Sequence, residues 1–131
     1  MIVDTSALVA IVRGEADAGS YTRALLDSAV NRMSAGTFLE LSIVLDRSRD
    51  AADGRRVDEI ITATGIRIEP VDAEAALVAR AAHRDFGRGS GHRARLNFGD
   101  CFAYALAKST GEPLLYKGDD FGHTDIRSAL A

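Results

Sequence analysis

Acidic residues at four positions of this 131-residue chain could do chemistry together. Asp4 follows the short apolar segment that starts the chain, and the pair Asp119 and Asp120 follows another apolar segment near its end. Glu40 and Asp100 lie in apolar stretches that are expected to be helical. A carboxylate among apolar neighbours is costly unless it is paired or bound to a cation, and several that converge raise one another's pKa. Oxygen ligands of this kind suit Mg²⁺ or Mn²⁺, so the sequence favours a divalent metal site.

Each of these acids also has a purely structural interpretation. Asp4 could cap a helix or close a turn, and the acidic pair in KGDDFG lies in a sequence typical of turns. Thr37-x-x-Glu40 matches a capping box, and Asn97-x-x-Asp100 imitates one less well. Taken singly, each acid can be explained in this way. Acids that occur together at strand ends and inside apolar helices are harder to explain without a shared site.

Short strands that alternate with helices are predicted along the whole chain. The predicted elements are strand 1–3, helices 5–13 and 17–29, a brief strand 31–34, helices 37–49 and 55–64, strand 66–71, helices 73–86 and 98–109, and strand 114–116. This order predicts a single α/β domain over residues 1–131, with a parallel sheet covered by helices on both faces. In such sheets ligand sites form at the carboxyl ends of the strands, where Asp4 and the acidic pair would lie.

The composition limits the class of protein. Hydrophobic content of 47% and charged content of 27% are ordinary for a soluble globular protein, and no apolar run is long enough to span a membrane. The single cysteine, Cys101, excludes an internal disulfide and is interpreted as a packed thiol; with no secretion signal at the start, the expected location is the cytoplasm. The histidines lack a zinc-binding spacing. Four phenylalanines are expected in the core: Phe38, Phe98, Phe102 and Phe121.

A basic segment between two predicted helices is a candidate for contact with nucleic acid. The net charge of the chain is −3, which by itself does not favour phosphate binding. The local charge is nevertheless positive, because four arginines gather over a short range. They are Arg84, Arg88, Arg93 and Arg95. Guidance of an RNA backbone and a merely solvated loop are equally consistent with this pattern.

Four motifs, taken in order and spacing, resemble those of PIN-domain proteins and most closely of the VapC toxins of bacterial toxin–antitoxin pairs. The motifs are DTSAL at 4–8, TFLEL at 37–41, NFGDC at 97–101 and KGDDF at 117–121. The resemblance covers the whole chain, and its last segment is the most specific part. It implies a three-layer α/β/α fold with a short central parallel sheet, and a magnesium-dependent endoribonuclease.

The same resemblance implies roles for individual residues. The first three acids of the family correspond to Asp4, Glu40 and Asp100. The small hydroxyl residue two places after the first acid corresponds to Ser6, which would orient Asp4 or a metal-bound water. Asp4, Asp100 and a fourth acid would hold Mg²⁺, while Glu40 would contact the attacking water or help to hold a second ion. The products would then carry a 5′-phosphate and a 3′-hydroxyl.

The fourth acid is ambiguous in this sequence. The position that often carries it in the family is occupied by Gly118, and Asp119 and Asp120 follow one and two places later. Either acid could substitute, and Asp119 is preferred.

The resemblance also implies partners. VapC-type toxins are bound by a cognate VapB-type antitoxin whose tail lies across the acidic site. Homodimers are also usual in the family, and the apolar surplus on the first helices leaves room for such an interface.

One alternative function is an inactive PIN-fold interaction module. Another is a phosphatase with an aspartyl nucleophile, but that chemistry requires a second Asp at the position of Ser6. A nuclease assay with Mg²⁺ or Mn²⁺ separates both alternatives from a ribonuclease.

Overall fold

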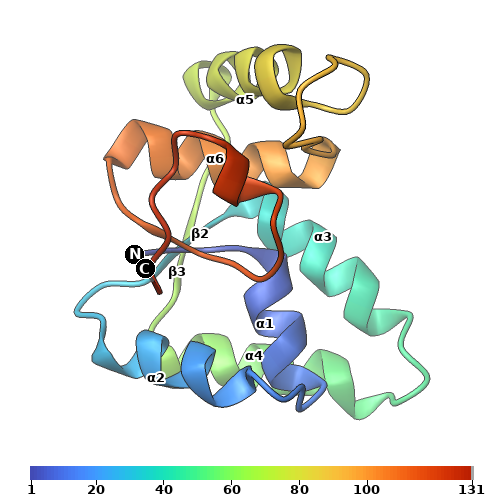
Figure 1. The fold of residues 1–131 in the computed structure, drawn as a ribbon. Helices are drawn as coiled ribbons and strands as arrows, with labels where there is room; N and C mark the ends of the chain where they lie inside the picture. Colours follow the sequence, from blue (N-terminus) through green and yellow to red (C-terminus); the bar gives the residue numbers. More distant parts are fainter. Residues whose placement is uncertain (131) are drawn as a thin grey trace.

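The computed structural model describes residues 1–130, and Figure 1 shows a layered arrangement of helices around a small sheet. In chain order the elements are β1 (Ile2–Val3), α1 (Thr5–Val12), α2 (Ala18–Asp27), β2 (Arg32–Ser34), α3 (Ala35–Asp46), α4 (Ala52–Thr64), β3 (Arg67–Glu69), α5 (Ala73–Phe86), α6 (Phe98–Thr110), β4 (Leu114–Leu115) and the short 3₁₀ helix η1 (Phe121–His123). No helix among these described residues is long and apolar enough to cross a membrane.

The four strands form one parallel sheet in the order β3-β2-β1-β4. β1 lies between β2 and β4, so the strand that directly precedes Asp4 is hydrogen-bonded on both sides. The Asp4 N–H donates to the Leu115 carbonyl at 3.0 Å, and the Arg32 N–H donates to the Met1 carbonyl at 2.9 Å. Since all strands run in the same direction, their carboxyl ends meet at one edge of the sheet.

Two apolar cores lie on opposite faces of this sheet. Val3, Met33 and Leu115 belong to the core that α1, α2, α3 and α4 complete. Ile2 and Leu114 belong to the core that α5 and α6 complete. Because neighbouring residues of a strand point to opposite faces, even strands of two residues join both cores. Figure 1 shows α5 and α6 above the strands and α1, α2 and α4 below them, which confirms the predicted α/β/α layers.

The predicted order of elements is confirmed, but some helix boundaries are not. α3 begins at Ala35, two residues earlier than predicted, because the Ser34 side chain caps it by accepting from the Gly36 N–H at 3.2 Å. It ends at Asp46, before the predicted end at 49. The next helix, α4, begins at Ala52 rather than at 55.

The prediction that four phenylalanines lie in the core is only partly right. Phe121 is buried, and Phe38 and Phe102 are half-buried. Phe98 is 78% exposed, because it occupies the first position of α6, where its ring makes an edge-to-face contact with Phe102 at a centroid distance of 5.0 Å. It therefore contributes to the surface near the acidic residues rather than to the core.

Candidate active site

Asp4 is the most deeply buried of the candidate acids, with 3% of its surface exposed. It is the N-cap of α1, and its Oδ2 accepts from the Ser6 N–H at 3.1 Å and from the Ser6 hydroxyl at 2.6 Å. The other oxygen, Oδ1, is buried and accepts no hydrogen bond from the described residues. Burial raises the pKa of Asp4 above its usual value, the bonds from Ser6 oppose this, and the charge of Glu40 adds to the rise. A buried carboxylate oxygen without a hydrogen-bond donor is suited to bind a cation.

Asp100 also combines a capping role with a place in the site. It forms a capping box at the start of α6, in which Oδ2 accepts from the Asn97 N–H at 3.0 Å and the Asp100 N–H donates to Asn97 Oδ1 at 2.8 Å. Oδ1 of Asp100 accepts no hydrogen bond from residues 1–130. The pKa of Asp100 is raised to about 7. Burial is the largest cause, the hydrogen bond from the Asn97 N–H opposes the rise, and the charges of Asp4, Asp120 and Glu40 add to it. Four acids thus act on one another electrostatically.

Glu40 does not take part in the capping box that its spacing with Thr37 suggested. α3 begins at Ala35, with Ser34 as its N-cap, and the Thr37 side chain is buried. Glu40 instead accepts a hydrogen bond from the Thr5 hydroxyl, with 2.7 Å between Thr5 Oγ1 and Glu40 Oε1. A side chain from α3 is thereby attached to the first turn of α1, next to Asp4.

The segment after β4 is tied to the site through Lys117. The Lys117 backbone N–H donates to Ser6 Oγ at 2.9 Å. The Ser6 hydroxyl therefore accepts one hydrogen bond from Lys117 while it donates another to Asp4. The Lys117 ammonium group pairs with Glu15 and, at 3.0 Å, with Asp17. These ion pairs attach the segment to the connection between α1 and α2, and they engage the Lys117 ammonium group with acids outside the site.

The two candidates for the fourth acid differ in their electrostatic effect. Asp119 and Asp120 are both exposed, and their carbonyl oxygens close the turns that lead into η1. The charge of Asp120 raises the pKa of Asp100, whereas Asp119 is not among the causes of that shift. The electrostatics therefore favour Asp120, although the sequence favoured its neighbour.

The acidic cluster consists of the four acids that act on one another and the alternative fourth acid: Asp4, Glu40, Asp100, Asp119 and Asp120. None of the five forms an ion pair within residues 1–130. Within residues 1–130, no group of three acidic, histidine or cysteine side chains is arranged so that it could coordinate a metal ion. Like charges without a counter-ion repel one another. Binding of a cation would therefore require the acidic side chains to move closer together, and the unsatisfied Oδ1 of Asp4 fits such a ligand.

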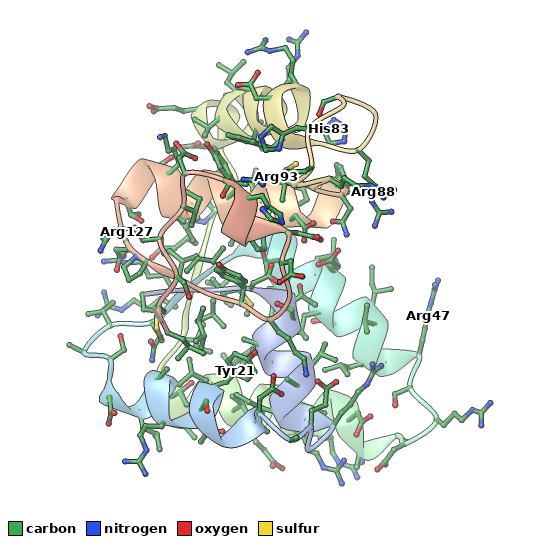
Figure 2. All side chains as sticks on the ribbon, viewed as in Figure 1. Tyr21, Arg47, His83, Arg88, Arg93 and Arg127 are labelled. Carbon is green, nitrogen blue, oxygen red and sulfur yellow. The ribbon has the colours of Figure 1, made fainter. Side chains whose placement is uncertain are left out.

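The predicted arginine cluster lies beside the end of α6 that carries Asp100. All four arginines are exposed, and only Arg84 forms an ion pair within the described chain, with Asp85 at 3.7 Å. The loop that holds the others is closed at its base, because the Arg88 N–H donates to the Leu96 carbonyl at 3.0 Å. Figure 2 shows Arg88 and Arg93 where this loop approaches α6, while Arg127 lies on the other side of the molecule.

Cys101 behaves as a packed thiol rather than as a nucleophile. It is buried in α6, and its Sγ donates to the Asn97 carbonyl at 3.3 Å. Burial, with a smaller effect of the Asp100 charge, raises the pKa of the Cys101 thiol to about 11. A thiol with so high a pKa is a poor nucleophile near neutral pH.

Three residues that support the site were missed by the sequence analysis. Thr5 holds Glu40, Lys117 holds Ser6, and Gly99 leaves room for the Glu40 carboxylate. All three lie inside the motifs DTSAL, KGDDF and NFGDC, so their positions were visible. Their roles depend on contacts between distant segments, which the motifs themselves do not reveal.

Comparison with known proteins places this geometry in a family. The PIN domain family model matches residues 1–127. Ribonuclease VapC28 of Mycobacterium tuberculosis is 55% identical over 130 residues, which cover 99% of this chain and 98% of the relative. Ribonuclease VapC30 of the same species is 44% identical over 126 residues, which cover 96% and 95%. The crystal structure of M. tuberculosis VapC20, described as a sarcin–ricin loop cleaving toxin, matches with a TM-score of 0.74 over 95% of both chains; at 21% identity this likeness shows the fold alone.

We expect the metal-free protein to lose stability as Asp100 ionises. Its folded pKa of about 7 lies above the ordinary value of 3.8, so the folded state binds this proton more tightly. The contribution is fully present below the ordinary pKa and is lost as the pH rises through the folded pKa. Asp100→Asn keeps an acceptor for the Asn97 N–H but carries no charge. Its melting temperature relative to wild type should therefore rise between about pH 5 and about pH 8.

Circular dichroism melts in the presence of a chelator measure this difference. Asp27→Asn, at an exposed position of α2, is the matched control and should show no such trend. A difference for Asp100→Asn that stays constant over this range would contradict the assignment.

Proposed function

Because the chain belongs to the PIN-domain family and, within it, to the VapC proteins, we propose that it is a metal-dependent endoribonuclease and the toxin of a toxin–antitoxin pair. The observation that carries the proposal is the buried Oδ1 of Asp4, which has no hydrogen-bond partner among residues 1–130 and lies near three further acids. The names of the relatives support RNA as the substrate, since they are called ribonucleases. We place the activity in the cytoplasm.

We assign the metal, Mg²⁺ or alternatively Mn²⁺, to Asp4, Asp100 and one of the acids after β4. Of these, Asp120 is the better candidate, because its charge acts on Asp100, and Asp119 is retained as the alternative. When bound, the ion would lower the pKa of a water molecule and neutralise negative charge on the phosphodiester. Carboxylates of this number and type suit a hard cation that prefers oxygen ligands.

The other residues of the site keep the acids in place for this chemistry. Ser6 occupies Oδ2 of Asp4, which leaves Oδ1 for the cation. Glu40 holds its Oε1 against Thr5, and we assign the remaining carboxylate oxygen to contact with the attacking water or a second ion. Without a cation, the cluster would repel an RNA phosphate. The reaction would leave a 5′-phosphate and a 3′-hydroxyl.

Two other functions remain as outcomes of the same assay. An inactive PIN-fold interaction module and a phosphatase with an aspartyl nucleophile both predict no cleavage of RNA. The phosphatase chemistry requires an acid–base group two residues after Asp4, but that position is Ser6, whose hydroxyl is engaged with Asp4 and Lys117. No observation favours either alternative over a nuclease.

Removal of the metal or of its proposed ligands should abolish cleavage while the fold is retained. EDTA, Asp4→Asn and Asp100→Asn should each reduce the rate with Mg²⁺ by about 100-fold or more, because the metal-activated water is lost. The measurement is cleavage of labelled single-stranded RNA, with melting temperature as the test of folding. Asp27→Asn is the control that should cleave normally. Full activity in EDTA, or in both site variants, would show that the proposal is wrong.

We also propose that the exposed arginines guide the RNA backbone towards the acids. Arg88→Gln with Arg93→Gln, made in an Asp4→Asn background that cannot cleave, should weaken binding of a single-stranded RNA. The slope of log affinity against log salt should fall by about 1.4, since each phosphate contact on a single strand contributes about 0.7. Arg23→Gln on α2 is the control. An unchanged slope would mean that the loop is only solvated.

The proposed protein partners are a VapB-type antitoxin and a second copy of the chain. An acidic cluster without a counter-ion would attract an arginine or lysine from the antitoxin tail, as an alternative to the metal. For the homodimer, the structure offers a different surface from the one that the sequence suggested. The exposed apolar side chains beside the site come from α3 and α6, not from α1. They are Leu39, Ile43, Val44 and Phe98, and they line a groove of about 370 Å³ next to Glu40.

If the homodimer forms through α3 and α6, a charge placed on that surface should dissociate it. Ile43 is 44% exposed, so Ile43→Asp should leave the fold intact while it disfavours burial against a second copy. Sedimentation velocity at micromolar concentration measures the mass. Leu26→Asp on α2 tests the surface of the first helices, since Leu26 is 66% exposed. Dissociation by Leu26→Asp alone would favour the earlier prediction, and a monomeric wild type would exclude the dimer.

A further inference from the structure

We propose that Gly99 is a positioning residue, whose bare backbone leaves the space that the Glu40 carboxylate occupies in the acidic cluster. The inference rests on the proposed function, because it assigns to Gly99 a role in building the metal site. Its basis is a close approach of two helices. α3 and α6 lie against each other, with the start of α6 beside the second turn of α3 (Figure 1).

A side chain at position 99 and the observed position of Glu40 exclude each other. An ideal Cβ built on Gly99 would have as its three nearest neighbours the three atoms of the Glu40 carboxyl group. Even the farthest of them, Oε1, would lie only 2.8 Å away, and the other two would overlap with the Cβ. Gly99 is itself buried in the first turn of α6, so the carboxylate lies directly against the helix backbone.

The opposite side of the carboxylate is held by Thr5. The Thr5 hydroxyl donates to Glu40 Oε1 at 2.7 Å. The first turn of α1 therefore binds one carboxylate oxygen, and the first turn of α6 leaves room for the other. Asp4 precedes the first of these turns and Asp100 lies in the second. The clamp formed by Thr5 and Gly99 thus places the charge of Glu40 between the two acids proposed as metal ligands.

No backbone requirement explains a glycine at position 99. Its φ is not in the left-handed region, where glycine is favoured, and alanine is the stronger helix former at such a position. Gly19 in α2 has an ordinary helical backbone as well, and a Cβ there would meet nothing within 4 Å. The feature that distinguishes Gly99 is the Glu40 carboxylate.

Gly36, at the same contact between α3 and α6, shows the contrast with a packing role. A Cβ on Gly36 would meet the Phe102 ring at 2.5 Å, and a rigid aromatic ring yields less easily than the end of a flexible side chain. The atoms that approach Gly99 belong to the end of a flexible side chain. Alanine at position 99 should therefore displace Glu40 from the cluster rather than separate the two helices. The fold should survive while the site loses one acid.

The test compares Gly99→Ala, Glu40→Ala and the double variant, with Gly19→Ala as the matched helical control. Mn²⁺ affinity is measured by calorimetry, cleavage by the RNA assay with Mg²⁺, and folding by melting temperature. Gly99→Ala should lose about tenfold or more in Mn²⁺ affinity, the range found when residues that orient metal ligands are removed, and should resemble Glu40→Ala. The double variant should show no further loss. Gly19→Ala should bind and cleave as wild type does.

A second pair of variants tests the other side of the clamp. Thr5→Val removes the donor to Glu40 with little change of shape and should also lower Mn²⁺ affinity. Thr5→Ser keeps the hydroxyl and should restore the affinity. If Gly99→Ala lowers the melting temperature, the double variant should restore it, because the Glu40 carboxylate that overlaps with the new Cβ is then absent.

The outcomes distinguish this inference from the proposed function. Wild-type affinity in Gly99→Ala, additive losses in the double variant, or a lowered melting temperature that the double variant does not recover would each overturn the role of Gly99. If Asp4→Asn loses Mn²⁺ while Gly99→Ala does not, the metal site stands without this inference. If the wild type binds no Mn²⁺, the metal site itself is wrong and the inference fails with it.

Discussion

Asp4 holds a carboxyl group inside the protein, where one oxygen accepts hydrogen bonds from Ser6 and the other has no donor among the residues that the structure describes. An incompletely paired buried carboxylate destabilises the folded state, so the surrounding structure has to compensate for it. Part of the compensation is local, because Asp4 lies at the N-terminus of α1, where the helix dipole favours a negative charge. The sheet also fixes the Asp4 backbone, because the interior strand β1 precedes it and the Asp4 N–H donates to the Leu115 carbonyl.

The distribution of positive charge preserves this imbalance. Lys117 is close enough to donate its N–H to Ser6, but its ammonium group is engaged by Glu15 and Asp17. Of the four clustered arginines, Arg84 lies in the last turn of α5 and the other three lie on the loop before α6. Within residues 1–130 none of them pairs with the clustered acids. The chain thus separates an acidic centre from a basic rim. This separation suits a polyanionic substrate, because a cation supplied at the centre and arginines at the rim can share its charge.

The order of elements and the location of Asp4 could be predicted because they depend on local patterns. The acid after the first apolar segment marks the end of a strand. In the same way, Asp72 marks the start of α5 and Gly111 marks the end of α6, as the structure confirms. The start of α3 could not be predicted in the same way. Thr37 and Glu40 have the spacing of a capping box, but α3 begins earlier, with Ser34 as its N-cap. Glu40 accepts a hydrogen bond from Thr5 instead. Phe98 was predicted to lie in the core on hydrophobicity alone, and its position at the start of α6 exposes it.

The site itself shows why capping and ligand binding are not alternatives for a carboxylate. Asp4 and Asp100 each cap a helix with Oδ2, as the structural interpretation of the sequence required, and each has Oδ1 left over. A cap fixes the side-chain torsions and brings the second oxygen to a defined place, so it prepares the residue for a ligand. Glu40 has no cap to fix it, and it is positioned instead by contacts from two other helices, through Thr5 and Gly99. The acids with local support were therefore recognisable from spacing, whereas the support of Glu40 becomes visible only when α1, α3 and α6 are brought together.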